Sequence, residues 1–197
     1  MNYLAHAYLS FDHPEILVGN MISDFVKGKK QYEYPEMIQK GIRLHRAIDT
    51  FTDAHAATRK ARQLFKPSVG LYAGAFVDVV YDHFLARQDE AFTGKPLPVF
   101  ANWVYSELGK QQAYLPERFA GMLPYMQAQN WLYNYRQAEG IRKSFGGLVR
   151  RAAYLDDPLP AYHLFTEHYH TLAGLFTEFF PELQNFALTQ FNVLLMH

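Results

Sequence analysis

Residues 71–86, LYAGAFVDVVYDHFLA, are apolar almost all round, which is the pattern of a helix buried at the centre of a protein. A helix places Asp78 and Asp82 one turn apart on one side, with His83 next to Asp82. Burying two carboxylates is unfavourable unless a metal ion, an arginine or a shared proton compensates their charge. The segment has no Lys or Arg before Arg87, so the compensating group must come from elsewhere in the chain.

The rest of the chain also has helical spacing, and no strand-type alternation exceeds a few residues. Pro14, preceded by the expected cap residues Asp12 and His13, predicts a helix that reaches about Val26. Pro35 opens a second, long helix. Further helices are predicted at about 55–65, 99–110, 116–128, 138–154 and 160–179, with a loop over 89–98 and a last helix from Pro181. The prediction is an all-α, single-domain helical bundle over residues 1–197.

The composition fits one buried core and excludes several classes of protein. The chain has 197 residues, of which 49% are apolar, and a formal net charge of zero, without the basic excess of a nucleic-acid binder. The absence of cysteine excludes disulfides and thiolate metal sites. No signal-peptide pattern is present, and the most apolar window is too short to span a bilayer. We expect a cytoplasmic protein that binds no nucleic acid and does not insert into membranes, with its oligomeric state left open.

The second long helix carries polar residues where its apolar stripe should continue. His45 and Asp49 are spaced by four residues on that stripe, so they can present two ligands to one ion, or Asp49 can orient His45. Near the N-terminus, His6 is followed by the segment GNMISDF, in which Asn20 and Asp24 lie one turn apart on an otherwise apolar helix. Three apolar helices thus carry acids or histidines, and one metal site at the bundle centre would explain all of them.

Each of these signals also has an ordinary explanation. A buried histidine is often satisfied by hydrogen bonds in the core, and the Asp78–Asp82 pair could form ion pairs with arginines. Three further histidines in the segment YHLFTEHYH do not share one helical face, so we interpret them as surface or interface residues: His163, His168 and His170.

Four motifs in order resemble those of the acyl carrier protein phosphodiesterase family: NYLAH (2–6), GNMISDFVKG (19–28), GIRLHRAIDTFTD (41–53) and DVVYDHFLAR (78–87). The later WLYNYR and FTEFFP also look like that family. The resemblance implies an HD-domain-like fold and a metal-dependent enzyme that cleaves the phosphodiester between 4′-phosphopantetheine and a serine of holo acyl carrier protein, typically with Mn²⁺. The sequence contains no His-Asp dipeptide, and the order is reversed in Asp82-His83.

With this resemblance, we hypothesise roles for the polar residues. A divalent ion activates water, neutralises a phosphate oxygen and aligns the displacement. Oxygen-rich ligation suits Mn²⁺ or Mg²⁺, with Fe²⁺ or Zn²⁺ as alternatives. The expected ligands are Asp24, His45 and Asp82, with His6 or His83 as a further one. Asp49 and Asp78 would orient ligands or accept a proton, Arg46 would bind phosphoryl oxygens, and His83, His6 or a water would protonate the leaving serine oxygen.

An acidic carrier protein should dock on basic residues even though the net charge is zero. One candidate set is Arg142, Lys143, Arg150 and Arg151, and another is Lys27, Lys29 and Lys30; either could instead be a solvated surface. Two other functions compete with this reading. One is an HD-like phosphohydrolase acting on a nucleotide or another small phosphoester. The other is a non-catalytic helical module that binds acyl chains or a partner protein, with Asp78 and Asp82 paired with arginines.

Overall fold

Helices α2 (Pro14–Ile22) and α3 (Glu36–Ala54) pack closely because each has a glycine at their contact. A Cβ atom on Gly19 would lie 2.1 Å from the carbonyl oxygen of Ile38, and one on Gly41 would lie 2.3 Å from a carbonyl oxygen of α2. A larger residue at either position would force the two backbones apart. The contact therefore brings the last turn of α2 beside the middle of α3.

Helix α5 (Ala73–Ala86) is the buried helix that the sequence predicts. It contacts α1 (Tyr3–Tyr8), α4 (Ala56–Val69), α9 (Ala138–Arg151) and α11 (Tyr169–Met196). Neighbours on several sides explain why its sequence is apolar almost all round.

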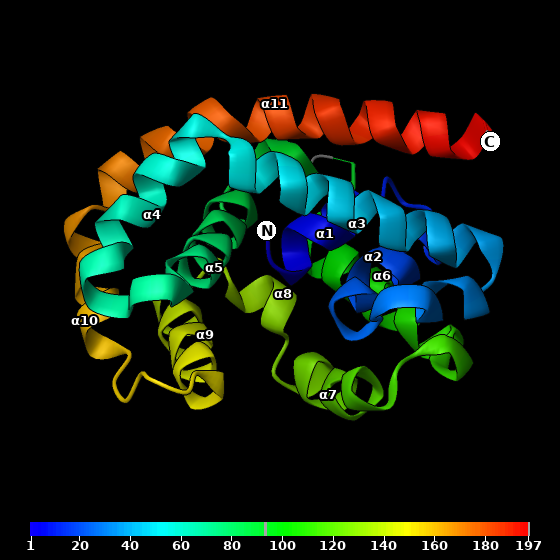
Figure 1. The fold of residues 1–197 in the computed structure, drawn as a ribbon, viewed down its shortest axis with the longest axis horizontal. Coiled ribbons are helices and arrows are strands. Elements are labelled where there is room, and N and C mark those ends of the chain that lie inside the picture. Colours follow the sequence, from blue (N-terminus) through cyan, green and yellow to red (C-terminus); the bar gives the residue numbers. More distant parts are fainter. Residues whose placement is uncertain (93, 197) are drawn as a thin grey trace.

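The long helix α11 forms one edge of the molecule, and α3 and α4 run along it (Figure 1). On the side opposite α11 lie α7 (Glu117–Ala128), α8 (Trp131–Asn134) and α9. Residue Met1 lies in the interior between these two sides, where its amino group approaches side chains of both α3 and α5. The start of α1 is therefore the point on which the surrounding helices converge.

The computed structural model describes residues 1–92 and 94–196, and no strand occurs among them. The predicted all-α fold is confirmed as a single helical domain. The remaining elements are α6 (Leu97–Lys110) and α10 (Leu159–Glu167), with 3₁₀ turns at Ser23–Phe25 (η1), Gly28–Glu33 (η2), Gly70–Tyr72 (η3), Asp89–Phe92 (η4) and Gln112–Tyr114 (η5). The short turn η4 occupies part of the predicted loop 89–98, in which position 93 lies outside the described residues.

The predicted start of α2 at Pro14 is confirmed. The ring nitrogen Nδ1 of His13 accepts a hydrogen bond from the backbone N–H of Ile16 at 3.5 Å and so caps the helix. Asp12, the other expected cap residue, instead forms an ion pair with Lys95 at 2.9 Å. The helix ends at Ile22, which is earlier than predicted, and the chain continues as the 3₁₀ turn η1.

Two predicted helix boundaries, at Pro67 and at Pro181, are wrong. Both prolines lie inside helices, Pro67 in α4 and Pro181 in α11. A proline inside a helix removes one backbone hydrogen bond, but burial of the neighbouring apolar residues, such as Phe180 beside Pro181, favours the continuous helix. The actual break comes at His168, between α10 and α11.

One stretch, Ala56–Ala86, is long and apolar enough to cross a membrane by length and composition alone. It consists of α4, η3 and α5, and 67% of its most apolar window is buried inside the protein. The chain turns within the stretch at Gly70, where φ is 55°. The burial and the turn are both features of core helices packed against other helices.

Candidate metal centre

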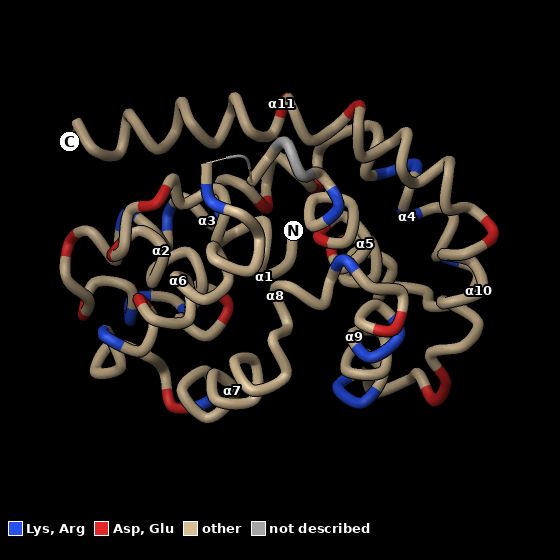
Figure 2. The backbone as a smooth tube through the Cα atoms, turned by 180° about the vertical axis from the view of Figure 1, so that it is seen from behind, with Lys and Arg blue, Asp and Glu red and all other residues tan. Residues whose placement is uncertain are grey.

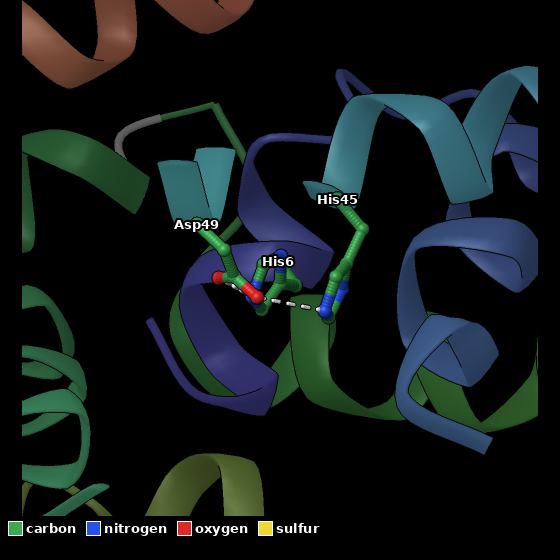
Figure 3. Close-up of side chains that lie close together, drawn as sticks. All are labelled: His6, His45 and Asp49. Carbon is green, nitrogen blue, oxygen red and sulfur yellow. Dashed lines mark ion pairs between the residues drawn. The ribbon is translucent and has the colours of Figure 1, made fainter. Parts of the chain in front are cut away.

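Two histidines and one aspartate bring their side chains together beside the start of α1 (Figure 3). His6 comes from α1, whereas His45 and Asp49 come from successive turns of α3. One atom from each of the three lies within 4.8 Å of the others. The nitrogen Nε2 of His6 lies 3.2 Å from Oδ1 of Asp49, and Nε2 of His45 lies 3.1 Å from Oδ2 of the same carboxylate. Asp49 is thus shared between the two imidazoles.

Asn20 holds both imidazole rings from the side away from Asp49. The ring nitrogen Nδ1 of His6 lies 2.8 Å from the side-chain Oδ1 of Asn20, and Nδ1 of His45 lies 2.7 Å from its backbone oxygen. The Asn20 amide group donates to the backbone oxygen of His6 and to Ser10 Oγ, which fixes its orientation. With Nδ1–H donating to Asn20, the Nε2 atom of each neutral histidine carries a lone pair that faces Asp49.

The two Nε2 atoms are buried, and neither has a hydrogen bond of good geometry. Buried polar atoms without a hydrogen bond are rare and need an explanation, such as an ion that is bound there. A small hollow of about 10 Å³, which is about the space of one water molecule, is lined by His6, His45, Asp24 and Asn20. The donor atoms, their orientation and the available space therefore fit one divalent cation.

The histidines and their acidic neighbours perturb one another's pKa values strongly. Burial, together with the charge of His45, lowers the pKa of His6 to about 4. Burial also acts to lower the pKa of His45, but the carboxylates of Asp24 and Asp49 outweigh it and raise that pKa to about 9. Although burial opposes it, the close approach of both histidines holds the pKa of Asp49 below its ordinary range. The pair thus shares one proton when no cation is present.

Asp24 lies at the solvent side of this group. Its Oδ1 atom is 3.4 Å from Nε2 of His45, and its side chain is 73% exposed because the 3₁₀ turn η1 carries it out of α2. The close approach of His45 lowers the pKa of Asp24. Asp24 lies within reach of a cation held by the histidines, and the ligand role that the sequence suggests for it stays a prediction.

A buried amino group lies next to the metal-binding group. The N-terminal nitrogen of Met1 is 3.1 Å from Asp78 Oδ1 and 3.5 Å from Asp49 Oδ1. Burial disfavours its charged form, but Asp78 and Asp49 outweigh this and raise its pKa to about 10. The main compensating charge for Asp78 is therefore this amino group, with a weaker contribution from Arg62, and sequence patterns carry no signal for it. Burial raises the pKa of the Asp78 carboxyl group.

Asp82 lies outside the group, which differs from the ligand role hypothesised from the sequence. Its carboxylate is fully buried and accepts hydrogen bonds from the backbone N–H groups of Asn2, Leu4 and Ala5, at 3.3, 2.7 and 3.2 Å. These are N–H groups of the first turn of α1, which have no partner inside the helix. Asp82 therefore anchors α1 to α5. Burial raises its pKa to about 7, although the N–H groups of Leu4 and Ala5 act to lower it.

His83 is also away from the group, and both of its ring nitrogens have partners. Nδ1 lies 2.7 Å from the backbone oxygen of Tyr135, and Nε2 lies 3.0 Å from the hydroxyl group of Tyr169. Burial lowers the pKa of His83 to about 4. These contacts join α5 to the segment after α8 and to the start of α11, so the structure gives His83 a role in packing.

Arg46 points away from the two histidines. Its guanidinium group donates to Gln31 Oε1 at 2.8 Å and to the backbone oxygen of Val26 at 3.2 Å, which holds the segment after α2 against α3. The three lysines proposed for docking lie in that exposed segment: Lys27, Lys29 and Lys30. The other basic set lies on the exposed face of α9, as the blue positions there show (Figure 2): Arg142, Lys143, Arg150 and Arg151.

Sequence reasoning found four of the residues that the structure places at the centre, namely His6, Asp24, His45 and Asp49. It assigned no role to Asn20, although a buried amide in the apolar helix α2 is itself a signal. It also expected Asp49 beside the ligands and Asp82 among them, whereas in the structure Asp49 contacts both imidazoles and Asp82 binds backbone N–H groups of α1 instead.

An all-α bundle whose helices direct two histidines and a carboxylate at one point defines a class: helical proteins with a centre that can hold a divalent cation. Within that class the chain belongs to the acyl carrier protein phosphodiesterase family, whose model matches residues 1–183. Curated proteins named acyl carrier protein phosphodiesterase align over almost the whole chain. The protein from Enterobacter sp. (strain 638) is 32% identical over 184 residues, which cover 93% of this chain and 95% of that protein.

Two further relatives carry the same name. The proteins from Klebsiella pneumoniae (strain 342) and from Yersinia pestis are each 32% identical over 188 residues, which cover 95% of this chain and 97% of each of them. No solved structure matches the chain, so the expected likeness to HD-type phosphohydrolases remains a prediction.

Proposed function

We propose that the protein hydrolyses the phosphodiester between 4′-phosphopantetheine and a serine of holo acyl carrier protein, to give apo carrier protein and 4′-phosphopantetheine. Membership of the family supports this reaction. The observation that carries the proposal is the pair of buried Nε2 atoms of His6 and His45, which lack a hydrogen bond of good geometry and lie 3.2 and 3.1 Å from the shared carboxylate of Asp49. This group can hold a divalent cation, as a phosphodiester hydrolase of this kind requires.

His6, His45 and Asp49 would hold the cation, and Asp24 would approach it from the solvent side. When bound, the cation supplies Lewis-acid activation and neutralises charge on the phosphoryl group. Two imidazole nitrogens with carboxylate oxygens suit Mn²⁺, Fe²⁺ or Zn²⁺ better than Mg²⁺, which prefers oxygen ligands. Mn²⁺ is the cation we expect.

The remaining residues orient groups and move protons. Asn20 fixes both imidazole rings, so that their Nε2 lone pairs point at the cation site. Asp78 is the proposed proton acceptor, because burial raises the pKa of its carboxyl group and the Met1 amino group links that carboxyl group to Asp49. His83 does not take part in proton transfer in this proposal, since both of its ring nitrogens are engaged.

The proposed partner, an acidic carrier protein, would dock on the basic face of α9. Arg150 and Arg151 lie in the last turn of that helix, and both are exposed. Exposed charges of this kind steer an acidic partner and fix its orientation. Lys27, which is also exposed, would be a second docking position. The proposal places the reaction in the cytoplasm, since the chain has no cysteine and suits a reducing compartment.

Incubation of holo carrier protein with the enzyme and Mn²⁺, followed by intact-protein mass measurement, tests the function. We expect the carrier to lose the mass of the 4′-phosphopantetheine arm and gain a free serine hydroxyl group. An unchanged carrier, together with turnover of a nucleotide or another small phosphoester in the same preparation, would replace the proposal with a small-molecule phosphohydrolase. An unchanged carrier without any such turnover would favour a binding module.

A further inference from the structure

A cavity of about 800 Å³ lies between α1, α5, α8 and α9. Its size falls within the range of sites that bind small organic molecules. Asn2 and Tyr3 line this cavity and also the small hollow at the metal centre, so both spaces border the first turn of α1. A ligand whose phosphate lies at the metal centre would reach the cavity by passing these two residues.

The position of Tyr3 between the two spaces is also evident from its surroundings. Burial raises the pKa of Tyr3 to about 12, and Arg151 from the cavity side and Asp24 from the metal side act on it in opposite directions. Its hydroxyl group contacts only the sulfur atom of Met122, at 3.8 Å, among the hydrogen bonds of the described residues. A weakly held hydroxyl group at this junction is free to bond with a ligand that passes it.

The lining of the cavity mixes aromatic, amide and hydroxyl groups with charged side chains, namely Glu139, Arg142, Lys143, Arg150 and Arg151. Trp131 and Tyr135 provide ring surface, and Asn134 and Ser144 provide donors and acceptors. The pantetheine chain has the matching chemistry, because its amide and hydroxyl groups alternate with short apolar segments. A carrier protein is a folded domain and stays outside, so of the two substituents on the scissile phosphate only the thin arm can enter.

Two glycines on α9 leave room for a ligand in this space. Gly146 and Gly147 both line the cavity in the interior of a helix, where glycine is less favourable than alanine by about 1 kcal/mol. A Cβ atom on either would meet only the guanidinium group of Arg150, at 3.7 Å, so helix packing does not require glycine. Gly140 differs, since a Cβ atom there would lie 1.9 Å from the backbone oxygen of Asn134. The missing side chains at 146 and 147 keep the cavity open.

We propose that the cavity between α1, α5, α8 and α9 binds the pantetheine arm of the substrate, with Tyr3 and Asn2 at the entrance from the metal centre. The proposal rests on the proposed function and names the subsite that the arm occupies. The carrier protein remains at the rim, against the exposed basic residues of α9.

Filling the cavity tests this assignment. Gly147→Phe places a ring in the cavity without a clash against backbone, and Gly174→Phe on α11 is the matched control, because a Cβ atom there meets nothing within 4 Å and Gly174 does not line the cavity. Pantetheine binding to each full-length protein is measured by isothermal titration calorimetry. We expect wild type and Gly174→Phe to bind pantetheine, and Gly147→Phe to bind it about tenfold or more weakly. If Gly147→Phe does not fold, Ser144→Trp fills the same space.

Two further measurements separate this proposal from the proposed function. Bis(4-nitrophenyl) phosphate lacks the arm, so its Mn²⁺-dependent hydrolysis tests the metal centre alone and should be equal in wild type and Gly174→Phe; its absence in wild type would count against the metal centre and not against the cavity. Equal pantetheine binding by wild type and Gly147→Phe, or no binding by wild type, would overturn the assignment. Loss of apo carrier binding in Gly147→Phe would also overturn it, because the cavity would then hold protein.

Discussion

The imidazole rings of His6 and His45 are stacked, with their centroids 3.9 Å apart and an angle of 14° between their planes. Two protonated rings at this distance would repel each other, which adds to burial in lowering the pKa of His6, whereas the carboxylates of Asp24 and Asp49 raise the pKa of His45. Because Asn20 holds both Nδ1 atoms, the Nε2 atoms lie side by side and face Asp49. The pair is therefore arranged to share one charge, either a proton or a cation.

Removal of divalent metal should abolish phosphodiesterase activity, and Mn²⁺ should restore it. Mn²⁺ at one hundred times its dissociation constant should also stabilise the folded protein by about 2.7 kcal/mol, since only the folded chain assembles the site. Metal analysis, activity assays and thermal melts before and after dialysis against a chelator check this. Full activity in a preparation shown to be free of metal would contradict the proposed centre.

Asn20→Ala should weaken Mn²⁺ binding by about 10- to 100-fold, because the ring of His6 loses the hydrogen bond that orients it. Calorimetric titration with Mn²⁺ measures the change. The matched control is Asn185→Ala, at an exposed position on α11 far from the centre in sequence. Unchanged affinity in Asn20→Ala would mean that packing alone orients His6.

Asp82→Ala should destabilise the metal-free protein by about 2–4 kcal/mol, because the first turn of α1 loses the acceptor of three backbone N–H groups. A residue that only bound metal would leave the stability of the metal-free protein almost unchanged when removed. Urea denaturation of the metal-free proteins distinguishes the two roles. Asp156→Ala, at an exposed position outside any helix, serves as the control.

Mn²⁺ affinity should rise with pH up to about 9. The pKa of His45 in the folded, metal-free protein is raised to about 9, above its ordinary value of 6.5. The ion pairs of His45 therefore stabilise the fold fully below about pH 6.5, and this stabilisation is lost as pH rises through 9. Mn²⁺ must displace the same proton, so affinity should increase by up to about tenfold per pH unit below that pKa. Titrations from pH 6.5 to 8.5 check the slope; a flat profile would show that His45 binds neither the proton nor the ion as described.

Charge reversal of Arg150 and Arg151 to Glu should slow association with the acidic carrier protein and reduce its dependence on salt, because exposed charges act over roughly 8 Å at physiological ionic strength. Stopped-flow association at several salt concentrations measures both effects. Hydrolysis of a small phosphodiester should be unchanged. Reversal of Lys60 and Lys66, which are exposed on α4, is the matched control. An equal effect of both double variants would mean that net charge, and not the α9 surface, directs the partner.

Much of the fold follows from local patterns that the sequence shows directly. The apolar segment around Val79 predicts the buried helix α5, and Pro14 after His13 predicts the start of α2, because capping and burial depend on neighbouring residues. The same local rules fail at Pro67 and Pro181. There, distant apolar contacts outweigh the preference of proline for helix ends.

The sequence by itself determined that this is an all-α protein, that it resembles one phosphodiesterase family, and that His6, Asp24, His45 and Asp49 are candidates for one centre. Those properties depend on residue type and helical spacing, which any reader of the chain can measure. Only the tertiary structure decided which acids reach the histidines. Asp49 and Asp82 both occupy core-facing helices. Asp82 lies against the start of α1 and binds its N–H groups. The close contact of α2 with α3 instead brings Asn20 to His45 and leaves Asp49 between the imidazoles. Periodicity fixes the face of a helix on which a side chain lies, and the neighbour that meets that face depends on how helices distant in the chain pack.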